Sequence, residues 1–206
     1  MRLAAILVLA LAGCGLSPIG GTPPAGTDDA GTPARDAYTA ASDAGTVSGT
    51  VGGRRPFIGD VFSYDDTFDF QQHAVTVRSV KITSYPGACT MQQDNDSHLA
   101  NSTYLKLIVG NQGSTPVTAQ TYPVVLGIEY APRTGPFALA NWKVLDATCV
   151  RTFTTATGGS IVVTSLTAAG MAGTFTLTFP NNDALEGSFT APSCAATAPT
   201  ALGICK

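Results

Sequence analysis

Apolar and polar residues alternate along the C-terminal half of the chain with the two-residue period of β-strands. Phe175, Leu177 and Phe179 alternate with threonines, which places the apolar side chains on one face of a strand. The flanking stretches continue the pattern and are separated from it by short polar turns. We therefore expect a three-stranded antiparallel meander, with strands at 160–166, 174–179 and 185–191 and turns at 167–170 and 180–183.

The stretches before this meander also have the length and composition of strands. Further strands are expected at 47–51, 74–82, 104–109, 122–130 and 137–145. Within 74–82 the apolar residues change phase after Arg78, which predicts a β-bulge near Ser79. Helical periodicity is not convincing anywhere in this region. Short strands separated by polar turns predict one all-β domain over 47–206, an antiparallel β-sandwich with a β-barrel as the alternative.

The segment before this domain has a different composition. Residues 14–46 are rich in Gly, Pro, Ala, Thr and Asp and contain almost no large apolar residues. Such a composition cannot bury enough apolar surface to offset chain entropy, so a flexible linker is expected. Partial packing on the domain through Tyr38 is the alternative.

The first thirteen residues read as an export signal. Arg2 precedes an apolar run over 3–12, about ten residues long, whereas a bilayer-spanning helix needs about twenty. The run ends in Leu11-Ala12-Gly13-Cys14, which resembles the lipobox of bacterial lipoproteins. The resemblance implies cleavage before Cys14, a diacylglycerol on its sulfur and a third acyl chain on the new amino group. An ordinary signal peptide cut after Ala12 is the alternative.

Lipidation of Cys14 would make the membrane a partner of this chain. One acyl chain gives marginal binding and two or more give stable binding, so three would form a durable anchor. The family resemblance also concerns location, because Gly15 stands where an Asp acts as an inner-membrane retention signal in many bacteria. We therefore expect an extracytoplasmic protein anchored in the outer membrane.

The charge of the chain excludes one class of partner. The formal net charge is -3, with only 12% charged residues. The one adjacent basic pair, Arg54 and Arg55, is not a basic patch. A weakly acidic chain offers no electrostatic reason to bind nucleic acid, so no nucleic-acid partner is expected.

The cysteine count fits a lipidated, exported protein. If Cys14 carries lipid, four of the five cysteines remain and can form two disulfides. Three pairings are open. Cys194 and Cys205 are close in sequence and Cys89 and Cys149 each lie in an expected loop, so we favour Cys89 with Cys149 and Cys194 with Cys205. A zinc site is the alternative for the last pair, but ten intervening residues are not a metal-ligand spacing. No cofactor is expected.

Candidate catalytic residues are few. The two histidines, His73 and His98, are not accompanied by a G-x-S-x-G motif, and isolated histidines are usually structural. Catalytic residues are therefore not assigned and the chain is not expected to be an enzyme. A hydrolase of envelope polymers remains the alternative, and it requires one of these histidines beside a carboxylate or hydroxyl in a cleft.

Two binding alternatives rest on residue clusters. Asp65, Asp66 and Asp69, and separately the loop 94–96, offer oxygen ligands that could suit calcium, although Asp and Asn clusters are chiefly turn formers. Aromatic side chains could instead form a stacking platform for sugars, although a single Trp in an apolar stretch is more often a core residue. The members of that platform would be Trp142, Tyr122, Tyr130 and Phe137.

A short repeat lies near the C-terminus. Gly173-Thr174-Phe175-Thr176 is echoed by Gly187-Ser188-Phe189-Thr190, each with a Gly two residues before a Phe. With the following 191–194 stretch, the pattern resembles the C-terminal part of uncharacterised lipoproteins of the myxobacterial type, a resemblance that implies no activity. The sequence thus predicts a lipid-anchored envelope protein with a non-catalytic β-domain of binding or structural role, its further partner being an unidentified protein or glycan.

Overall fold

The structure is a computed structural model that describes residues 44–70, 73–89, 99–112, 115–128, 131 and 134–195, without the side chains of 68–70, 73 and 74. All of these residues belong to the compact unit Tyr38–Lys206, and a second unit comprises Met1–Ala37. The expected signal peptide 1–13 and most of the linker 14–46 lie outside the described residues. No helix in the described part of the chain is long and apolar enough to cross a membrane.

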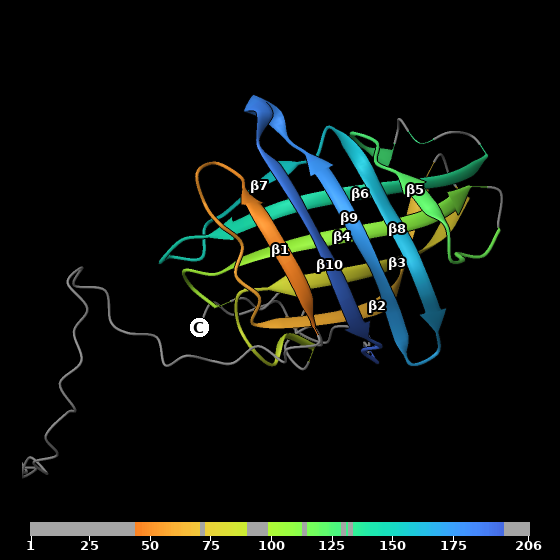
Figure 1. The fold of residues 1–206 in the computed structure, drawn as a ribbon, viewed down its shortest axis with the longest axis horizontal. Helices are drawn as coiled ribbons and strands as arrows, with labels where there is room; N and C mark the ends of the chain where they lie inside the picture. The colour runs from red at the N-terminus through yellow and green to blue at the C-terminus, as the bar shows by residue number, and fades with distance from the viewer. Residues whose placement is uncertain are drawn as a thin grey trace, which may run out of the picture. The chain divides into compact units, whose positions relative to one another are not determined.

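Ten strands form two five-stranded sheets in the described residues (Figure 1). The first sheet has the order β1-β10-β9-β8-β5, and the second has the order β2-β3-β4-β6-β7. Every neighbouring pair within each sheet is antiparallel. The strands are β1 (Gly45–Thr50), β2 (Asp60–Phe70), β3 (His73–Thr83), β4 (Thr103–Gln112), β5 (Thr121–Pro123), β6 (Gly135–Leu145), β7 (Arg151–Thr155), β8 (Gly158–Thr167), β9 (Gly170–Thr178) and β10 (Ala184–Pro192).

The two sheets pack face to face and their strands cross steeply (Figure 1). A single large apolar cluster fills the space between them, and both sheets contribute to it. Phe175, Leu177 and Phe189 enter it from the first sheet, and Leu107 and Trp142 enter it from the second. The predicted all-β sandwich is confirmed, and the sheets do not close into a barrel within the described residues.

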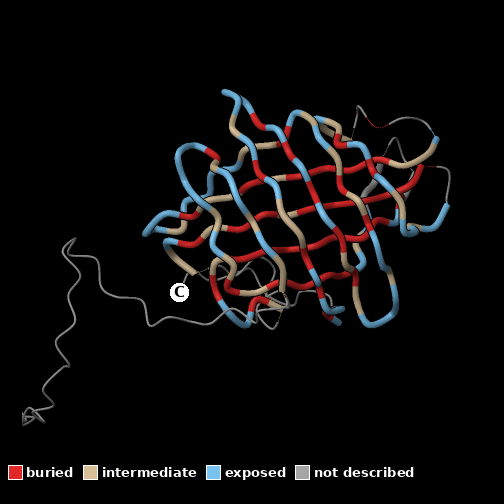
Figure 2. Tube along the Cα trace, in the orientation of Figure 1, coloured by how far each residue is buried: buried red, intermediate tan, exposed pale blue. Residues whose placement is uncertain are grey.

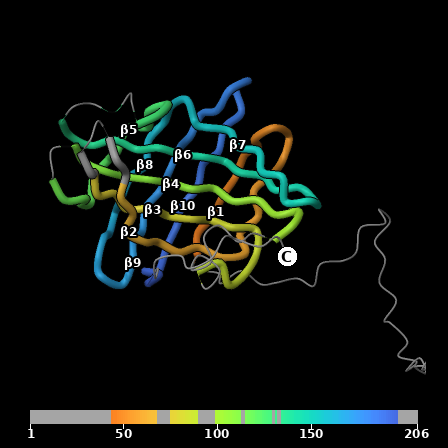
Figure 3. Tube along the Cα trace, turned by 180° about the vertical axis from the view of Figure 1, so that it is seen from behind, coloured from red at the N-terminus to blue at the C-terminus, as the bar shows by residue number. Residues whose placement is uncertain are grey.

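The outer faces of the two sheets differ in burial. Strands of the first sheet alternate between buried and more exposed residues, and in β9 the buried ones are Met171, Gly173, Phe175 and Leu177. In the second sheet β4 is buried almost continuously, with eight of its ten residues buried (Figure 2). The outer side of the second sheet is the side seen in Figure 3, and it is buried along β4 but open at β7, where Phe153 is 66% exposed. The outer face of the first sheet faces solvent.

The C-terminal meander and its two turns are confirmed, and the first strand also forms as expected. Strand β8 ends at Thr167, β9 begins at Gly170, and a 3-10 turn (Pro180–Asn182) connects β9 to β10. The strand expected at 122–130 is wrong, because β5 is only three residues long. Strands β2 and β7 were not expected, because neither has a clear apolar alternation.

The bulge expected near Ser79 is also wrong. Strand β3 pairs with β2 and β4 without a register shift. Val75 and Val77 belong to a cluster with Ile108 on the outer face, whereas Val80 and Ile82 belong to the central core. The apolar residues thus change face because each end of β3 is buried on a different side. A register irregularity occurs instead in β8, between Val163 and Ser165.

The short repeat has a structural explanation. In the register between β9 and β10, Phe175 lies opposite Gly187 and Phe189 lies opposite Gly173. A Cβ at Gly173 would come within 2.9 Å of Cζ of Phe189, and one at Gly187 within 3.0 Å of Cζ of Phe175. Each phenyl ring therefore covers the glycine of the neighbouring strand, and the repeat encodes two reciprocal Gly–Phe pairs.

Candidate functional surfaces

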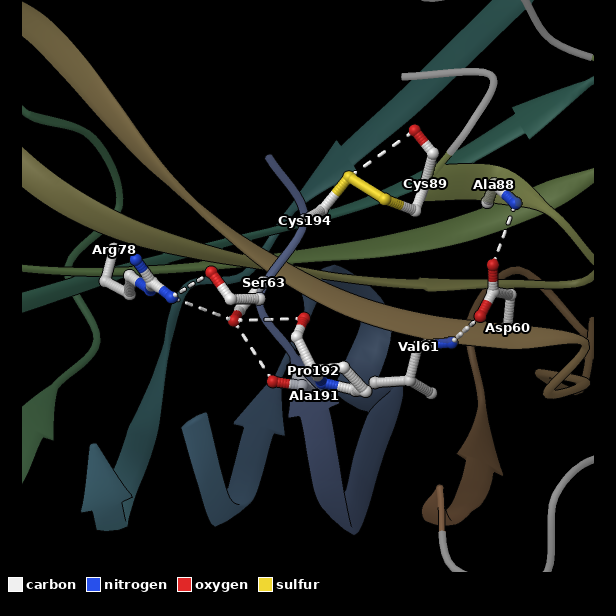
Figure 4. The surroundings of a disulfide bond; sticks show 10 residues. Asp60, Val61, Ser63, Arg78, Ala88, Cys89, Ala191, Pro192 and Cys194 are labelled. Carbon is white, nitrogen blue, oxygen red and sulfur yellow. Dashed lines mark hydrogen bonds between the residues drawn. A yellow bond between two sulfur atoms is a disulfide. The ribbon is translucent and has the colours of Figure 1, made fainter. Parts of the chain in front are cut away.

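The cysteines do not pair as the sequence suggested. Cys89 forms a disulfide with Cys194, across 105 residues, so the favoured pairing of Cys89 with Cys149 is wrong (Figure 4). The pairing of Cys194 with Cys205 fails for the same reason. Closeness in sequence misled the prediction, because the end of β10 passes the free edge of β2 and brings Cys194 beside the loop after β3. Cys149 is also disulfide-bonded, and Cys14 and Cys205 lie outside the described residues.

Two polar contacts hold the chain in place around this disulfide. The backbone N–H of Cys194 donates to the carbonyl of Ser63 at 2.7 Å. Asp60 accepts from the backbone N–H of Ala88 at 2.8 Å, which fixes the segment that leads to Cys89 (Figure 4). The disulfide and these contacts join the end of β10, in the first sheet, to β2 and to the loop after β3, in the second sheet.

A buried arginine also joins the two sheets where the end of β10 passes along β2, a place that we call the seam. Arg78, whose side chain is 9% exposed, donates from Nη1 to Asp65 at 2.7 Å. Its Nη2 donates to Ser63 Oγ at 3.3 Å and to Ser193 Oγ at 3.1 Å. Ser63 Oγ in turn donates to the carbonyl of Ala191 at 3.1 Å. These charge-assisted bonds link β2, β3 and the end of β10, which is a structural use of a buried charge.

The first cluster considered for calcium is divided between the two faces of a strand. Successive side chains of a strand point to opposite faces, and Asp65 and Asp66 follow this rule on β2. Asp65 pairs with Arg78 at the seam, and Asp66 pairs with Lys106 on the outer face at 3.0 Å. These two carboxylates therefore do not converge on one ion.

The remaining calcium ligands cannot be placed. The side chain of Asp69 and the whole loop 94–96 lie outside the described residues. Within the described part, no group of three or more His, Cys, Asp or Glu side chains is arranged to hold a metal ion.

The aromatic platform for sugars does not form. Trp142 is 3% exposed and belongs to the central core together with Tyr122, which is fully buried. Phe137 is also fully buried but lies in the separate outer cluster with Val77. These three rings therefore neither share a face nor reach solvent, and Tyr130 lies outside the described residues.

A hydrolase would require one of the two histidines, and the side chains of both lie outside the described part of the chain. His73 begins β3, and its side chain is outside the described part. His98 lies outside the described residues altogether.

A cluster of lysine and tyrosine side chains was not anticipated from the sequence. Every lysine in the described part of the chain lies on the outer face of the second sheet, as the register shows for Lys81, Lys106 and Lys143. Lys81 Nζ lies 6.0 Å from the ring centroid of Tyr64 and 5.3 Å from that of Tyr104. Lys106 Nζ lies 5.5 Å from the ring centroid of Tyr64, and Lys143 Nζ lies 5.1 Å from that of Tyr104. We call these five residues the lysine–tyrosine face.

Burial and charge shift the pKa values of two members of this face. Burial raises the pKa of Tyr64 above its ordinary value, against the opposing effect of the Lys106 ammonium. Burial by itself would lower the pKa of Lys106, but the negative charges of ionised Tyr64 and of Asp66 outweigh it and raise this pKa. Lys106 thus remains charged at neutral pH beside its carboxylate partner.

The solvent-exposed face of the first sheet is an array of hydroxyl groups. One row across the strands contains Ser48, Glu186, Thr176 and Ser160, in register order. The neighbouring row contains Thr46, Ser188, Thr174 and the apolar Val162, and the hydroxyls of Thr46 and Ser188 are 3.1 Å apart. Glu186 is the one charged residue that the described register places on this face. We call this surface the hydroxyl face.

The sequence contained a signal for each of these surfaces. The hydroxyl face follows from the threonines that alternate with core residues in the meander. The lysine–tyrosine face has a weaker signal, namely lysines such as Lys81 and Lys106 that stand inside otherwise apolar strands. Such lysines are ordinarily taken as solvent-facing, and the burial of this face depends on contacts distant in sequence.

Comparison with known proteins adds no relative. No protein-family model, curated protein or solved structure matches this chain, so the case for function rests on its own residues.

Proposed function

We propose that this chain is a lipid-anchored protein of the bacterial cell envelope whose β-sandwich is a non-catalytic binding or structural module. The observation that carries the proposal is the apolar run that ends in Leu11-Ala12-Gly13-Cys14. At about 0.8 kcal/mol per buried methylene, the acyl chains of a lipidated Cys14 hold the protein at a membrane. The composition of residues 15–43 suits a spacer between the lipid and the sandwich.

The cysteine chemistry supports an extracytoplasmic location. Disulfides persist in oxidising compartments and are rare in the cytosol. Cys89 and Cys194 form one, and Cys149 takes part in another. This usage agrees with export directed by the first thirteen residues, and outer-membrane anchoring follows from Gly15 after the lipidated cysteine.

The use of polar groups supports a non-catalytic module. Arg78, Ser63 and Ser193 are engaged with one another at the seam between the sheets. Lys106 and Asp66 form an ion pair on the outer face of the second sheet. The hydroxyl face, on the solvent-facing side of the first sheet, offers hydrogen-bonding groups with a single charge, which suits display or binding rather than proton transfer.

Metabolic labelling with an acyl-chain analogue tests the anchor. Wild-type protein should incorporate the label and Cys14→Ala should not, whereas the matched variant Cys205→Ala should label like wild type. Equal labelling of wild type and Cys14→Ala would overturn the anchor.

Purified protein incubated with isolated envelope polymers tests the absence of catalysis. We expect no soluble fragments to be released. Release that disappears in the double variant His73→Ala, His98→Ala would replace the binding module with a hydrolase.

A further inference from the structure

Each of the two sheets has two edge strands, and an edge strand exposes backbone N–H and C=O groups to which another chain can add a strand. Three of these four edges are closed or interrupted. The edge of β2 is met by the backbone of Ser193, through a parallel bridge to Ser63. Strand β5 has three residues and ends at Pro123, which has no N–H to donate. In β1, Gly45 and Gly49 have positive φ angles, which interrupt the regular extended backbone.

The fourth edge, that of β7, is regular and carries exposed apolar side chains (Figure 3). The strand contains neither Gly nor Pro and pairs with β6 without a register shift. Among the large apolar side chains that the structure describes, those of Phe153 and Val150 are the most exposed, at 66% and 60%. Phe153 lies in the middle of β7, and Val150 immediately precedes the strand. A regular edge strand with an exposed aromatic side chain at its centre is suited to strand addition.

The register shows which backbone groups of β7 face this open edge. Ala156, which directly follows β7, donates to the carbonyl of Ala140 on β6 at 2.9 Å. Backbone groups alternate in direction along a strand, so Thr154 and Thr152 also bond to their partners on β6. The N–H and C=O of Phe153, which lies between them, therefore point away from β6 and towards the open edge.

The sequence of β7 is complementary to itself. When two copies of β7 are placed antiparallel about a two-fold axis at Phe153, all five residues of the strand lie opposite a residue of the other copy, and no other antiparallel register achieves this. We propose that β7 is a homodimer interface, in which two copies of this chain pair their β7 strands about Phe153 and join their second sheets into one continuous sheet.

The side chains that this pairing brings together are compatible. The two Phe153 residues exchange both backbone hydrogen bonds, with their Cα atoms about 5.5 Å apart, and their rings lie side by side on the outer face, where Phe153 is opposite Lys143. Thr152 lies opposite Thr154, and cross-strand threonine pairs are favourable. Arg151 lies opposite Thr155, so the two Arg151 residues are about 14 Å apart and like charges do not face each other. This match of a strand with its own reverse is the reason to assign a second copy of the chain as the partner.

Sedimentation equilibrium of the purified mature protein, in a density-matched detergent, tests the dimer. We expect Phe153→Asp to dimerise at least about tenfold more weakly than wild type, because two carboxylates would face each other at the axis. Phe57→Asp is the matched control and should dimerise like wild type, because Phe57 is 53% exposed but lies in the loop before β2. Circular dichroism checks that both variants fold. A wild type that is monomeric at about 100 µM, or a Phe153→Asp protein that dimerises like wild type, overturns the proposal.

Amide hydrogen exchange of the wild-type protein, measured above and below the dissociation constant, tests the strand itself. The N–H of Phe153 faces the partner, so it should exchange at least about tenfold more slowly in the dimer than in the monomer. The N–H of Thr154 bonds to β6 within one copy, so it should exchange alike at both concentrations and serves as the internal control. Equal exchange of the Phe153 amide at both concentrations would place the interface elsewhere and overturn the proposal. The pairing does not depend on the lipid anchor, so mature protein without lipid should give the same result.

Discussion

The reciprocal Gly–Phe pairs make a prediction about the centre of the first sheet. A Cβ added at Gly173 would collide with the backbone carbonyl of Val162 on β8 and come within 2.9 Å of Cζ of Phe189. Strand β9 lies between β8 and β10, and the Phe189 ring is 2% exposed, so neither contact can relax freely. Overpacking of a tight core costs about 1–3 kcal/mol, and we expect Gly173→Ala to lie near 3 kcal/mol.

The equivalent change at Gly187 should cost less. Its added Cβ would collide with the carbonyl of Thr46 and come within 3.0 Å of Cζ of Phe175. Thr46 belongs to β1, which pairs only with β10 in the described sheet and can shift outwards. We therefore expect Gly187→Ala to destabilise by about 1.5 kcal/mol.

Urea and thermal unfolding, followed by circular dichroism, measure both effects. For a domain of this size 1 kcal/mol corresponds to about 2–4 °C, so Tm should fall by about 9 °C for Gly173→Ala and about 5 °C for Gly187→Ala. Gly158→Ala is the control, because its Cβ would meet the rotatable hydroxyl of Thr178 at 3.1 Å, and it should stay within about 0.5 kcal/mol of wild type. The packing argument is refuted if Gly173→Ala unfolds like the control, or if Gly187→Ala costs more than Gly173→Ala.

Two further predictions concern the charged groups. Arg78→Met keeps the apolar stem of the side chain but removes its hydrogen bonds across the seam, so it should lower the free energy of unfolding by about 2 kcal/mol. Asp65→Asn should change that free energy by less than about 1 kcal/mol, because the Asp65 side chain is 74% exposed. Equal effects of the two substitutions in urea unfolding would contradict this reasoning. The raised pKa values of Lys106 and Tyr64 mean that the folded state keeps protons that the unfolded state has already lost above about pH 10. The two protonated groups therefore stabilise the folded state at lower pH, and this contribution is lost as the pH rises through the folded-state pKa values. Unfolding free energies measured from pH 8 to 11.5 should fall more steeply for wild type than for Lys106→Met, and parallel curves would refute the coupling.

The first sheet could be predicted closely because only one of its faces is buried. In β9 and β10 the core residues alternate with threonine and serine, and the local pattern therefore states which face is inside. The short turns of the meander add Gly170 and Asn181, whose positive φ angles suit a turn. The local sequence pattern is sufficient to predict a strand that has one buried face and one solvent-exposed face.

The second sheet could not be predicted as well, because its central strands are buried on both faces. Val75 and Val77 face the outer cluster and Val80 and Ile82 face the central core, so the apolar phase of β3 changes without any backbone irregularity. Strand β2 was missed because it has no clear apolar alternation. Two of its aspartates, Asp65 and Asp66, belonged to the cluster that suggested an ion site, and each pairs with a cation on a different face of the sheet. These partners are distant in sequence, and neither spacing nor composition identifies them.

The disulfide pairing failed for a related reason. Proximity in sequence favoured Cys194 with Cys205, whereas topology places Cys194 beside Cys89 at the edge of β2. The contact depends on the passage of β10 along the seam, which is a property of the whole sandwich. The roles of Trp142 and Tyr122, in contrast, agree with the common role of aromatic residues in apolar stretches, because both are core residues.

The central claim concerns the mature N-terminus, and mass spectrometry of its N-terminal peptide tests it most directly. The account predicts a peptide that begins at Cys14 and carries the mass of a diacylglycerol and an additional acyl chain. A mature protein that begins elsewhere, or that begins at Cys14 with an unmodified sulfur, would contradict the membrane anchor.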